Sequence, residues 1–127
     1  QTCALPIWAP GDVFDFLAAR LKACQEAGIS VDRFAVDPGI GFGKTEAHSA
    51  LILNHLGLFH ALGCPLVVGG SRKRLIAAFS RGEPAEERLA GSVAIALAAV
   101  GEGAQIVRVH DVKETRQALA VRRMVMS

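Results

Sequence analysis

The sequence predicts an α/β fold in which helices cover a parallel sheet. Two observations lead to this prediction: short segments of strand length alternate with helical patterns along the chain, and these segments are mostly apolar. Strands that alternate with helices pair in parallel through right-handed crossovers, and strands covered on both faces are apolar throughout. A doubly wound sheet and a (β/α)8 barrel both satisfy this pattern.

The first half of the chain contains two predicted helices and one strand. Residues 12–27 form a helix with Asp12 as N-cap and Gly28 at its end, because apolar side chains recur at helical spacing. These side chains are Val13, Phe14, Leu17, Leu21 and Cys24. The segment "RFAVD", residues 33–37, is a short strand, and Thr45 caps a second helix that runs to about Leu62.

The second half contains two more strands and three helices. After Gly63 and Pro65, "LVVGG" is a strand, and "SRKRLIAAF" opens a short helix. Pro84 lies in the first turn of a longer helix through about residue 100, and "QIVRV" is the third strand. Asp111 and Glu114 have the spacing of a capping box for a last helix, residues 112–125.

The composition excludes several classes of protein. The 127 residues carry a formal net charge of +2, which is too small and too dispersed to indicate nucleic-acid binding. No apolar run reaches the ~18 residues of a membrane span, and no signal peptide is recognisable. Cys3, Cys24 and Cys64 are unclustered, so neither a disulfide framework nor a zinc site is indicated. We expect a cytoplasmic location.

The first eight residues, "QTCALPIW", differ from the rest of the chain. They lack periodicity and can be back-translated into the end of a common short-read sequencing adapter. We therefore expect residues 1–8 to be a translated artefact and residues 9–127 to be the C-terminal part of a longer protein. The alternative is an ordinary irregular N-terminus. Cys3 and Trp8 are left out of the functional argument.

The segment "DPGIGFGKT", residues 37–45, resembles a phosphate-binding P-loop but does not match one. With Gly43 and Lys44 at its end, such a loop requires glycine at position 38, which is Pro38. Proline has no N–H to donate to a phosphate. The segment is therefore predicted to be a glycine-rich connection from strand to helix, with the Asp37 carboxylate at its entrance.

Polar side chains occur at the same end of all three predicted strands. They are Asp37, Lys73, Arg108 and His110. In parallel α/β proteins ligands bind at the carboxyl ends of the strands. The two-residue period of a strand places Arg108 and His110 on the face away from the helices. A turn at Asp37, a solvated Lys73 and a capping role for His110 are the alternatives, whereas an unpaired buried guanidinium at Arg108 would be costly.

The chemistry of these residues indicates an anionic ligand. Lys73, Arg108 and His110 can bind anionic oxygens, and the backbone at residues 70–71 can approach a phosphate. Asp37 suits a paired N–H donor such as an amino-pyrimidine edge. The sequence contains no arrangement typical of a covalent nucleophile. Three further histidines lack metal-ligand spacing and are interpreted as structural: His48, His55 and His60.

Three segments together resemble the dihydropteroate synthase family: "FAVDPGIGFGKT", "PLVVGGSRKRLI" and "ERLAGSVAIALAAVGEGAQIVRVHDVKET". The resemblance extends over residues 12–126. It implies a TIM (β/α)8 barrel, of which this chain would supply the last three βα units. It also implies a transferase of folate biosynthesis that condenses 6-hydroxymethyl-7,8-dihydropterin diphosphate with 4-aminobenzoate. The intact protein would be a homodimer using Mg²⁺, with the metal ligand in the missing N-terminal part.

The resemblance also implies roles for individual residues. Asp37 would bind the pterin edge, Lys73 the pterin and the aminobenzoate site, and Arg108 the pterin face and the diphosphate. His110 would bind the diphosphate, and Phe42 would line the aminobenzoate pocket. The substrate-binding set predicted for this chain is Asp37, Gly41, Phe42, Ser71, Lys73, Arg108 and His110.

The sequence departs from the family pattern in places. Arg74 stands where many members have serine, and Ser49 stands where asparagine is expected. The first five strands are absent, so we expect the chain alone to be inactive. A pterin-dependent methyltransferase and a non-catalytic pterin-binding remnant are the alternative functions, and a P-loop nucleotide hydrolase is a distant third.

Overall fold

The computed structural model describes residues 8–127. The segment expected to derive from an adapter, residues 1–8, therefore lies outside the described residues except for Trp8. The α-helices are α1 (Ala9–Glu26), α2 (Glu46–Asn54), α3 (Arg74–Ala78), α4 (Leu89–Gly101) and α5 (Val112–Met126). The strands are β1 (Val67–Val68) and β2 (Ile106–Val107), and 3₁₀ turns cover Val31–Arg33, Leu56–Leu62 and Ala85–Glu87.

Three extended segments run in parallel at the centre of the molecule. Val36 forms a parallel bridge to Leu66, and β1 pairs with β2 in the register Val67 to Ile106. The backbone N–H of Val36 donates to Pro65 O at 2.8 Å, and that of Arg108 donates to Val68 O at 2.9 Å. The predicted α/β organisation with parallel strands is confirmed at this level.

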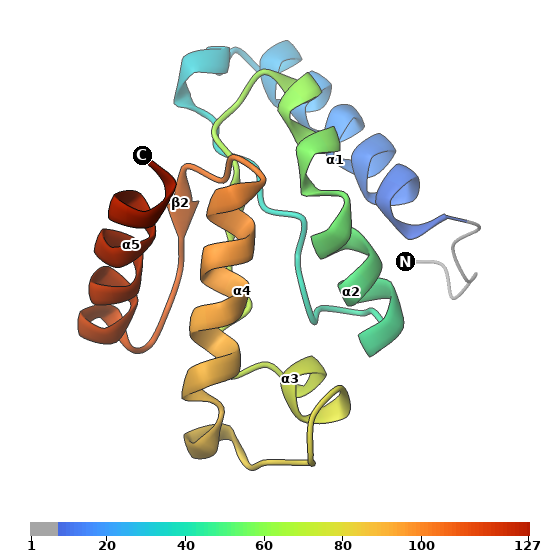
Figure 1. The fold of residues 1–127 in the computed structure, drawn as a ribbon. Coiled ribbons are helices and arrows are strands. Elements are labelled where there is room, and N and C mark those ends of the chain that lie inside the picture. The colour runs from blue at the N-terminus through green and yellow to red at the C-terminus, as the bar shows by residue number, and fades with distance from the viewer. Residues whose placement is uncertain (1–7) are drawn as a thin grey trace.

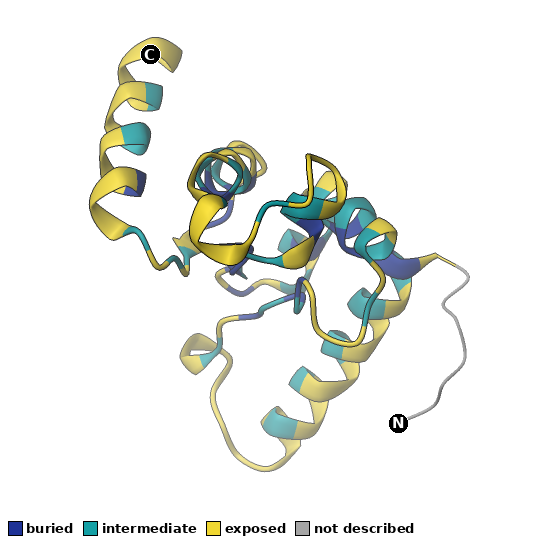
Figure 2. Cartoon of the chain, turned by 90° about the horizontal axis from the view of Figure 1, so that it is seen from below, coloured by how far each residue is buried: buried dark blue, intermediate teal, exposed yellow. Residues whose placement is uncertain are grey.

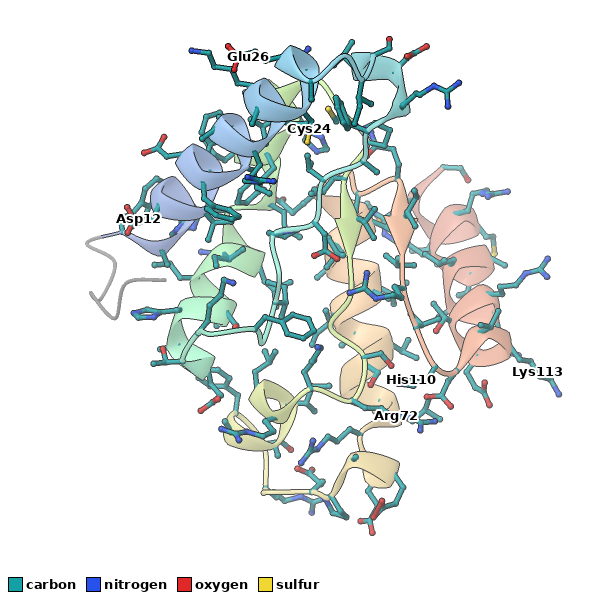
Figure 3. The ribbon with its side chains drawn as sticks, turned by 180° about the vertical axis from the view of Figure 1, so that it is seen from behind. Asp12, Cys24, Glu26, Arg72, His110 and Lys113 are labelled. Atoms are coloured by element: carbon teal, nitrogen blue, oxygen red, sulfur yellow. The ribbon has the colours of Figure 1, made fainter. Side chains whose placement is uncertain are left out.

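The helices lie on the outside of this layer. In Figure 1, α4 lies in the middle of the view, β2 and α5 lie on one side of it, and α1 and α2 lie together on the other. Seen from behind, β1 lies in front of α4, and β2 lies beside β1 on the side of α5 (Figure 3). The outward surface of α5 is mostly exposed (Figure 2). Because the three extended segments pair in parallel, their carboxyl ends lie at the same end of the molecule.

The core lies between the central layer, α1 and the α2 region. The central layer contributes the buried Leu66 and Val68, and α2 with the 3₁₀ turn after it contributes the fully buried Ile52, Leu56 and Phe59. The predicted apolar stripe of the first helix packs against this core through four of its members: Val13, Phe14, Leu17 and Leu21. Burial of these side chains is the main favourable contribution that sets the positions of the loops.

Several helix boundaries differ from prediction. Helix α1 begins at Ala9, so Asp12 lies in its first turn and is not the N-cap. The second helix breaks at His55, whose ψ of 27° and φ of −124° are not helical, and continues as a 3₁₀ turn. The residues after Pro84 form a separate 3₁₀ turn before α4 begins at Leu89. Thr45 is an N-cap as predicted, since its Oγ1 accepts a hydrogen bond from the His48 N–H at 3.1 Å.

The strands are shorter than predicted. The first is a single bridge at Val36, and β1 and β2 contain two residues each. The predicted alternation after β2 is nevertheless present, because residues 106, 108 and 110 are exposed while 107 and 109 are half-buried. The predicted capping box is wrong: the Asp111 side chain makes no hydrogen bond to the start of α5.

Candidate functional site

Three loops follow the three extended segments and meet at one end of the sheet. We call them the first loop (residues 37–45), the second loop (residues 69–73) and the third loop (residues 108–111). Each pair of loops is joined by at least one side-chain contact, so together they form a closed set. Figure 3 shows Arg72 of the second loop and His110 of the third loop near each other at this end.

An ion pair joins the first loop to the third. Arg108 Nη1 donates to Asp37 Oδ2 at 2.8 Å. The other carboxylate oxygen, Asp37 Oδ1, accepts the Gly39 N–H at 2.8 Å in an Asx turn. The Arg108 side chain is 56% exposed and the Asp37 side chain 32%. Arg108 is therefore neither buried nor unpaired, so the cost of burying an unpaired guanidinium does not arise.

Gly69 allows Arg108 to take this position. A Cβ on Gly69 would lie 2.8 Å from Arg108 Cζ, closer than side-chain atoms normally approach. The guanidinium thus lies against bare backbone at the end of β1, where only glycine leaves it room. Sequence reasoning did not identify this role, because the contact joins residues from different strands.

The first and second loops meet through Phe42 and Lys73. The Lys73 ammonium lies 3.9 Å from the centroid of the Phe42 ring, a cation–π contact. The stem of Lys73 passes over Gly41, where a Cβ would come within 3.1 Å of Lys73 Cδ. Phe42 is 62% exposed, so its ring is available to a ligand on its other face.

Two residues hold the first loop in shape. Lys44 Nζ donates to Gly39 O and to Phe42 O, each at 2.9 Å. The buried Ser49 Oγ accepts the Gly41 N–H at 3.1 Å. Burial lowers the pKa of Lys44 below its ordinary value, and the Asp37 charge partly opposes this shift. Serine at position 49, where the family resemblance led us to expect asparagine, therefore supplies an acceptor to the loop.

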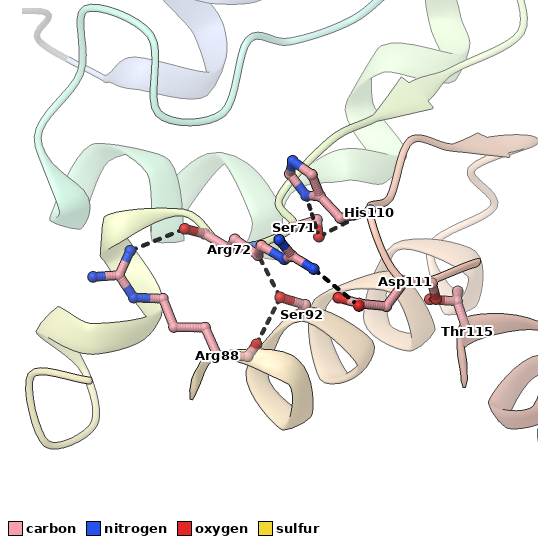
Figure 4. Close-up of polar contacts among 7 residues, drawn as sticks. All are labelled: Ser71, Arg72, Arg88, Ser92, His110, Asp111 and Thr115. Atoms are coloured by element: carbon pink, nitrogen blue, oxygen red, sulfur yellow. Dashed lines mark hydrogen bonds and ion pairs between the residues drawn. The ribbon is translucent and has the colours of Figure 1, made fainter. Parts of the chain in front are cut away.

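The second and third loops are joined by two pairs, shown in Figure 4. Ser71 Oγ lies 2.9 Å from His110 Nδ1 and also accepts the His110 backbone N–H at 3.3 Å. Arg72 Nη2 donates to Asp111 Oδ1 at 3.0 Å. The first pair occupies Nδ1 of the imidazole, so Nε2 is the ring nitrogen left to contact a ligand.

A cavity of about 320 Å³ lies between the first and second loops. Its size is at the lower end of the roughly 300–1,000 Å³ range of small-molecule pockets. Its lining is mostly cationic or polar: Gly41, Lys44, Glu46, Ser49, Arg72, Lys73, Arg74 and Leu75. Glu46 supplies the only carboxylate among these, and it lies 3.5 Å from the exposed Arg74 guanidinium. The cavity therefore favours an anionic group.

All seven predicted substrate-binding residues thus lie on the three loops. Contacts join them in pairs across loops: Asp37 with Arg108, Phe42 and Gly41 with Lys73, and Ser71 with His110. Their roles toward substrates stay predictions. The supporting residues were not predicted: Lys44, Gly69, Arg72 and the carboxylate of Asp111. The sequence offers one signal for two of them, because Arg72 directly follows Ser71 and Asp111 directly follows His110.

The remaining polar groups serve the fold. His55 Nδ1 lies 2.9 Å from Leu51 O, and His60 Nε2 lies 2.7 Å from Glu102 O, in agreement with the structural interpretation. Within residues 8–127, no three His, Cys, Asp or Glu side chains converge as a metal site. In the same range, no helix combines the length and apolar character needed to cross a membrane.

Comparison with known proteins identifies a family. Residues 10–110 match the model of the pterin binding enzyme family. The dihydropteroate synthase of Escherichia coli is 43% identical over 110 residues, which cover 87% of this chain and 39% of that protein. The chain therefore spans about two fifths of the length of this relative.

Solved structures agree with the sequence comparison. Dihydropteroate synthase from Xanthomonas albilineans in complex with 7,8-dihydropteroate superposes with a TM-score of 0.95 at 40% identity, covering 100% of this chain and 48% of that chain. The same enzyme with 4-aminobenzoic acid gives a TM-score of 0.94 at 41% identity, covering 98% of this chain and 45% of that one.

Proposed function

The chain belongs to the pterin binding enzyme family, and from this premise we propose that it is the C-terminal part of a dihydropteroate synthase. The complete enzyme would condense 6-hydroxymethyl-7,8-dihydropterin diphosphate with 4-aminobenzoate to give 7,8-dihydropteroate and diphosphate. The observation that carries this proposal is the closed set of contacts among the three loops. It gathers a carboxylate, an aromatic ring and several cations at the carboxyl ends of parallel strands.

The pterin would bind between Asp37 and Arg108. A carboxylate can accept two N–H bonds from an amino-pyrimidine edge. The ion pair with Arg108 would open for this purpose, and its partial exposure makes the cost of opening small, about 1 kcal/mol or less. The freed guanidinium is planar and can stack on the pterin while donating to the diphosphate.

The diphosphate would bind to His110, Ser71 and Arg108. Nδ1 of His110 is held by the Ser71 hydroxyl, and this contact orients Nε2 toward an incoming anion. Donors that are already oriented stabilise the charge that develops on a leaving group without reorganisation at the moment of reaction. These residues would therefore promote departure of diphosphate from the pterin methylene.

The 4-aminobenzoate would bind beside Phe42 and Lys73. The exposed face of the Phe42 ring suits an aromatic acid, and the cationic cavity between the first and second loops suits its carboxylate. The amine would attack the methylene carbon, the carbon–oxygen bond to diphosphate would break, and the amine would lose a proton. Placing the two substrates side by side supplies much of the rate enhancement, so no covalent nucleophile is required.

The remaining parts of the proposal concern the complete protein. The three parallel segments would be the last three strands of a (β/α)8 barrel, a fold of about 250 residues. The intact enzyme would be a homodimer. The Mg²⁺ implied by the family would be held outside residues 8–127, and none of the steps above involves it. We propose that the present chain alone is inactive, because three strands of eight cannot close a barrel and leave sheet edges unpaired.

The test begins by extending the coding sequence upstream of Ala9 and expressing the resulting full-length protein. We expect diphosphate release that requires both the pterin diphosphate and 4-aminobenzoate, and no release from the 127-residue chain. Binding of both substrates without diphosphate release would instead identify a non-catalytic pterin-binding protein. Methyl transfer from a folate donor would identify the alternative pterin-dependent activity.

A further inference from the structure

We propose that the Arg72–Asp111 ion pair acts as a clamp that positions Ser71 and His110 for diphosphate, so that Arg72 and Asp111 are positioning residues. This inference rests on the proposed function, because it concerns the same site. Arg72 Nη2 and Asp111 Oδ1 are 3.0 Å apart and join the second loop to the third. Ser71 precedes Arg72 and His110 precedes Asp111, so the clamp lies directly beside the Ser71–His110 contact (Figure 4).

The backbone of Arg72 is unusual. Its φ of 57° is the only positive value for a non-glycine residue among residues 8–127. Residues with a Cβ avoid this left-handed conformation unless the surroundings impose it. The conformation turns the chain between Ser71 and Lys73, which contact different loops.

Contacts with the start of α4 impose this conformation. The Arg72 N–H donates to Ser92 Oγ at 2.8 Å, and the Arg72 carbonyl accepts from Arg88 Nη1 at 2.9 Å. Ser92 Oγ in turn donates to the Arg88 carbonyl at 2.6 Å. The backbone N–H, the carbonyl and the guanidinium of Arg72 are thus all engaged, and the second loop is held from two sides.

The other end of the clamp is also fixed. The Asp111 carbonyl accepts from Thr115 Oγ1 at 2.8 Å and from the Thr115 N–H at 3.0 Å. The Asp111 side chain is 23% exposed and that of Arg72 is 39% exposed, so the pair is only partly screened by solvent. The backbone of Asp111 is therefore anchored to α5, while its carboxylate holds the Arg72 guanidinium.

Arg72 could position Ser71 and His110, or it could bind the anion directly. These two roles predict opposite changes in diphosphate affinity for one substitution. Asp111→Asn removes a negative charge near the site and leaves only a neutral acceptor, so it loosens the hold on the Arg72 guanidinium. If Arg72 bound the anion directly, diphosphate would bind more tightly to this variant. If the pair positions Ser71 and His110, diphosphate binds less tightly, because the donors lose their alignment.

The experiment uses the full-length protein and four variants: Asp111→Asn, Arg72→Gly, the double variant, and the double control Arg116→Gln/Asp32→Asn at exposed positions. Arg72→Gly removes the guanidinium but permits the left-handed backbone, so it limits loss of folding. Calorimetry measures the Kd of inorganic diphosphate, a coupled assay measures kcat/KM for the pterin diphosphate, and circular dichroism monitors the fold.

We expect each single variant to weaken diphosphate binding and to lower kcat/KM by about tenfold, with the fold retained. The double variant should lose no more than the more severe single variant, because both changes act on the same contact. The control should match the parent. Tighter diphosphate binding by Asp111→Asn, unchanged binding by either single variant, or additive losses would each overturn the clamp.

These outcomes separate the clamp from the proposed function. A parent protein that binds diphosphate without turnover contradicts the proposed function, while the binding data still test the clamp. A parent with turnover whose variants behave like it contradicts the clamp alone. A parent that does not bind diphosphate contradicts both.

Discussion

Substituting Gly69 by alanine tests whether the position of Arg108 matters for function. The φ of Gly69 is not among the positive values, so alanine is compatible with its backbone. The new Cβ would lie 2.8 Å from Arg108 Cζ. Arg108 Nη2 would lie closer still, so the guanidinium must recede by about 1 Å to reach the ~3.5 Å at which heavy atoms make favourable contact.

The expected effects on stability and on activity differ. Arg108 is 56% exposed and flexible, so it can move at little cost, and loss of its partly exposed pair with Asp37 costs about 1 kcal/mol or less. Displacement of a group that contacts both pterin and diphosphate should lower kcat/KM by roughly 10- to 100-fold. Gly69→Ala should therefore be a folded but poorly active enzyme.

The measurement compares Gly69→Ala with Gly57→Ala in the full-length protein. A Cβ on Gly57 would lie 3.6 Å from Glu102 Oε1, which is ordinary contact, so this variant is a matched control. Steady-state kinetics give kcat/KM, and thermal unfolding gives Tm. If Gly69→Ala retains the parent's kcat/KM, then the contact between Arg108 and the backbone at Gly69 is not needed for catalysis.

Three further predictions address the first loop, the core and a surface turn. Ser49→Ala leaves the Gly41 N–H without its acceptor, so we expect a loss of about 1 kcal/mol in urea unfolding and a raised KM for 4-aminobenzoate; an unchanged KM would contradict the role of Ser49. Phe59→Ala removes a fully buried ring and should cost about 3–5 kcal/mol in the same assay, whereas a cost below 1 kcal/mol would contradict the packing. The Ser80 hydroxyl, followed by backbone N–H groups, lowers the pKa of Glu83 from 4.5 to about 2. Stabilisation by ionised Glu83 is therefore complete above pH 4.5 and is lost as the pH falls toward 2, and NMR titration of the Glu83 carboxyl should give a higher pKa in Ser80→Ala.

Much of the local structure follows from the sequence. The apolar stripe of α1, the end of that helix before Gly28, the N-cap at Thr45 and the alternation after β2 depend on residues within a few positions of one another. Periodicity and capping are local effects, so the sequence alone is sufficient to predict them. The broken helix at His55 was missed because its apolar pattern continues through the break into the core residues Leu56 and Phe59.

The candidate site also combines features that the sequence predicts with contacts that it does not. The common location of Asp37, Lys73, Arg108 and His110 could be predicted, since the carboxyl ends of parallel strands meet at one edge. Their roles toward a ligand stay predictions. Their partners could not be predicted. Asp111 has the sequence spacing of a helix cap, yet its carboxylate binds Arg72, which is 39 positions away in the chain.

The α/β class, the order of the main elements and the loops that hold the candidate site residues follow from the sequence alone, because they depend on local pattern and strand direction. The pairing of side chains across those loops became visible in the three-dimensional structure alone. Asp37 and Arg108 are 71 positions apart, and Gly69 lies beneath the same guanidinium. Such contacts depend on how three segments align in space, and the packing of the core against the helices sets that alignment.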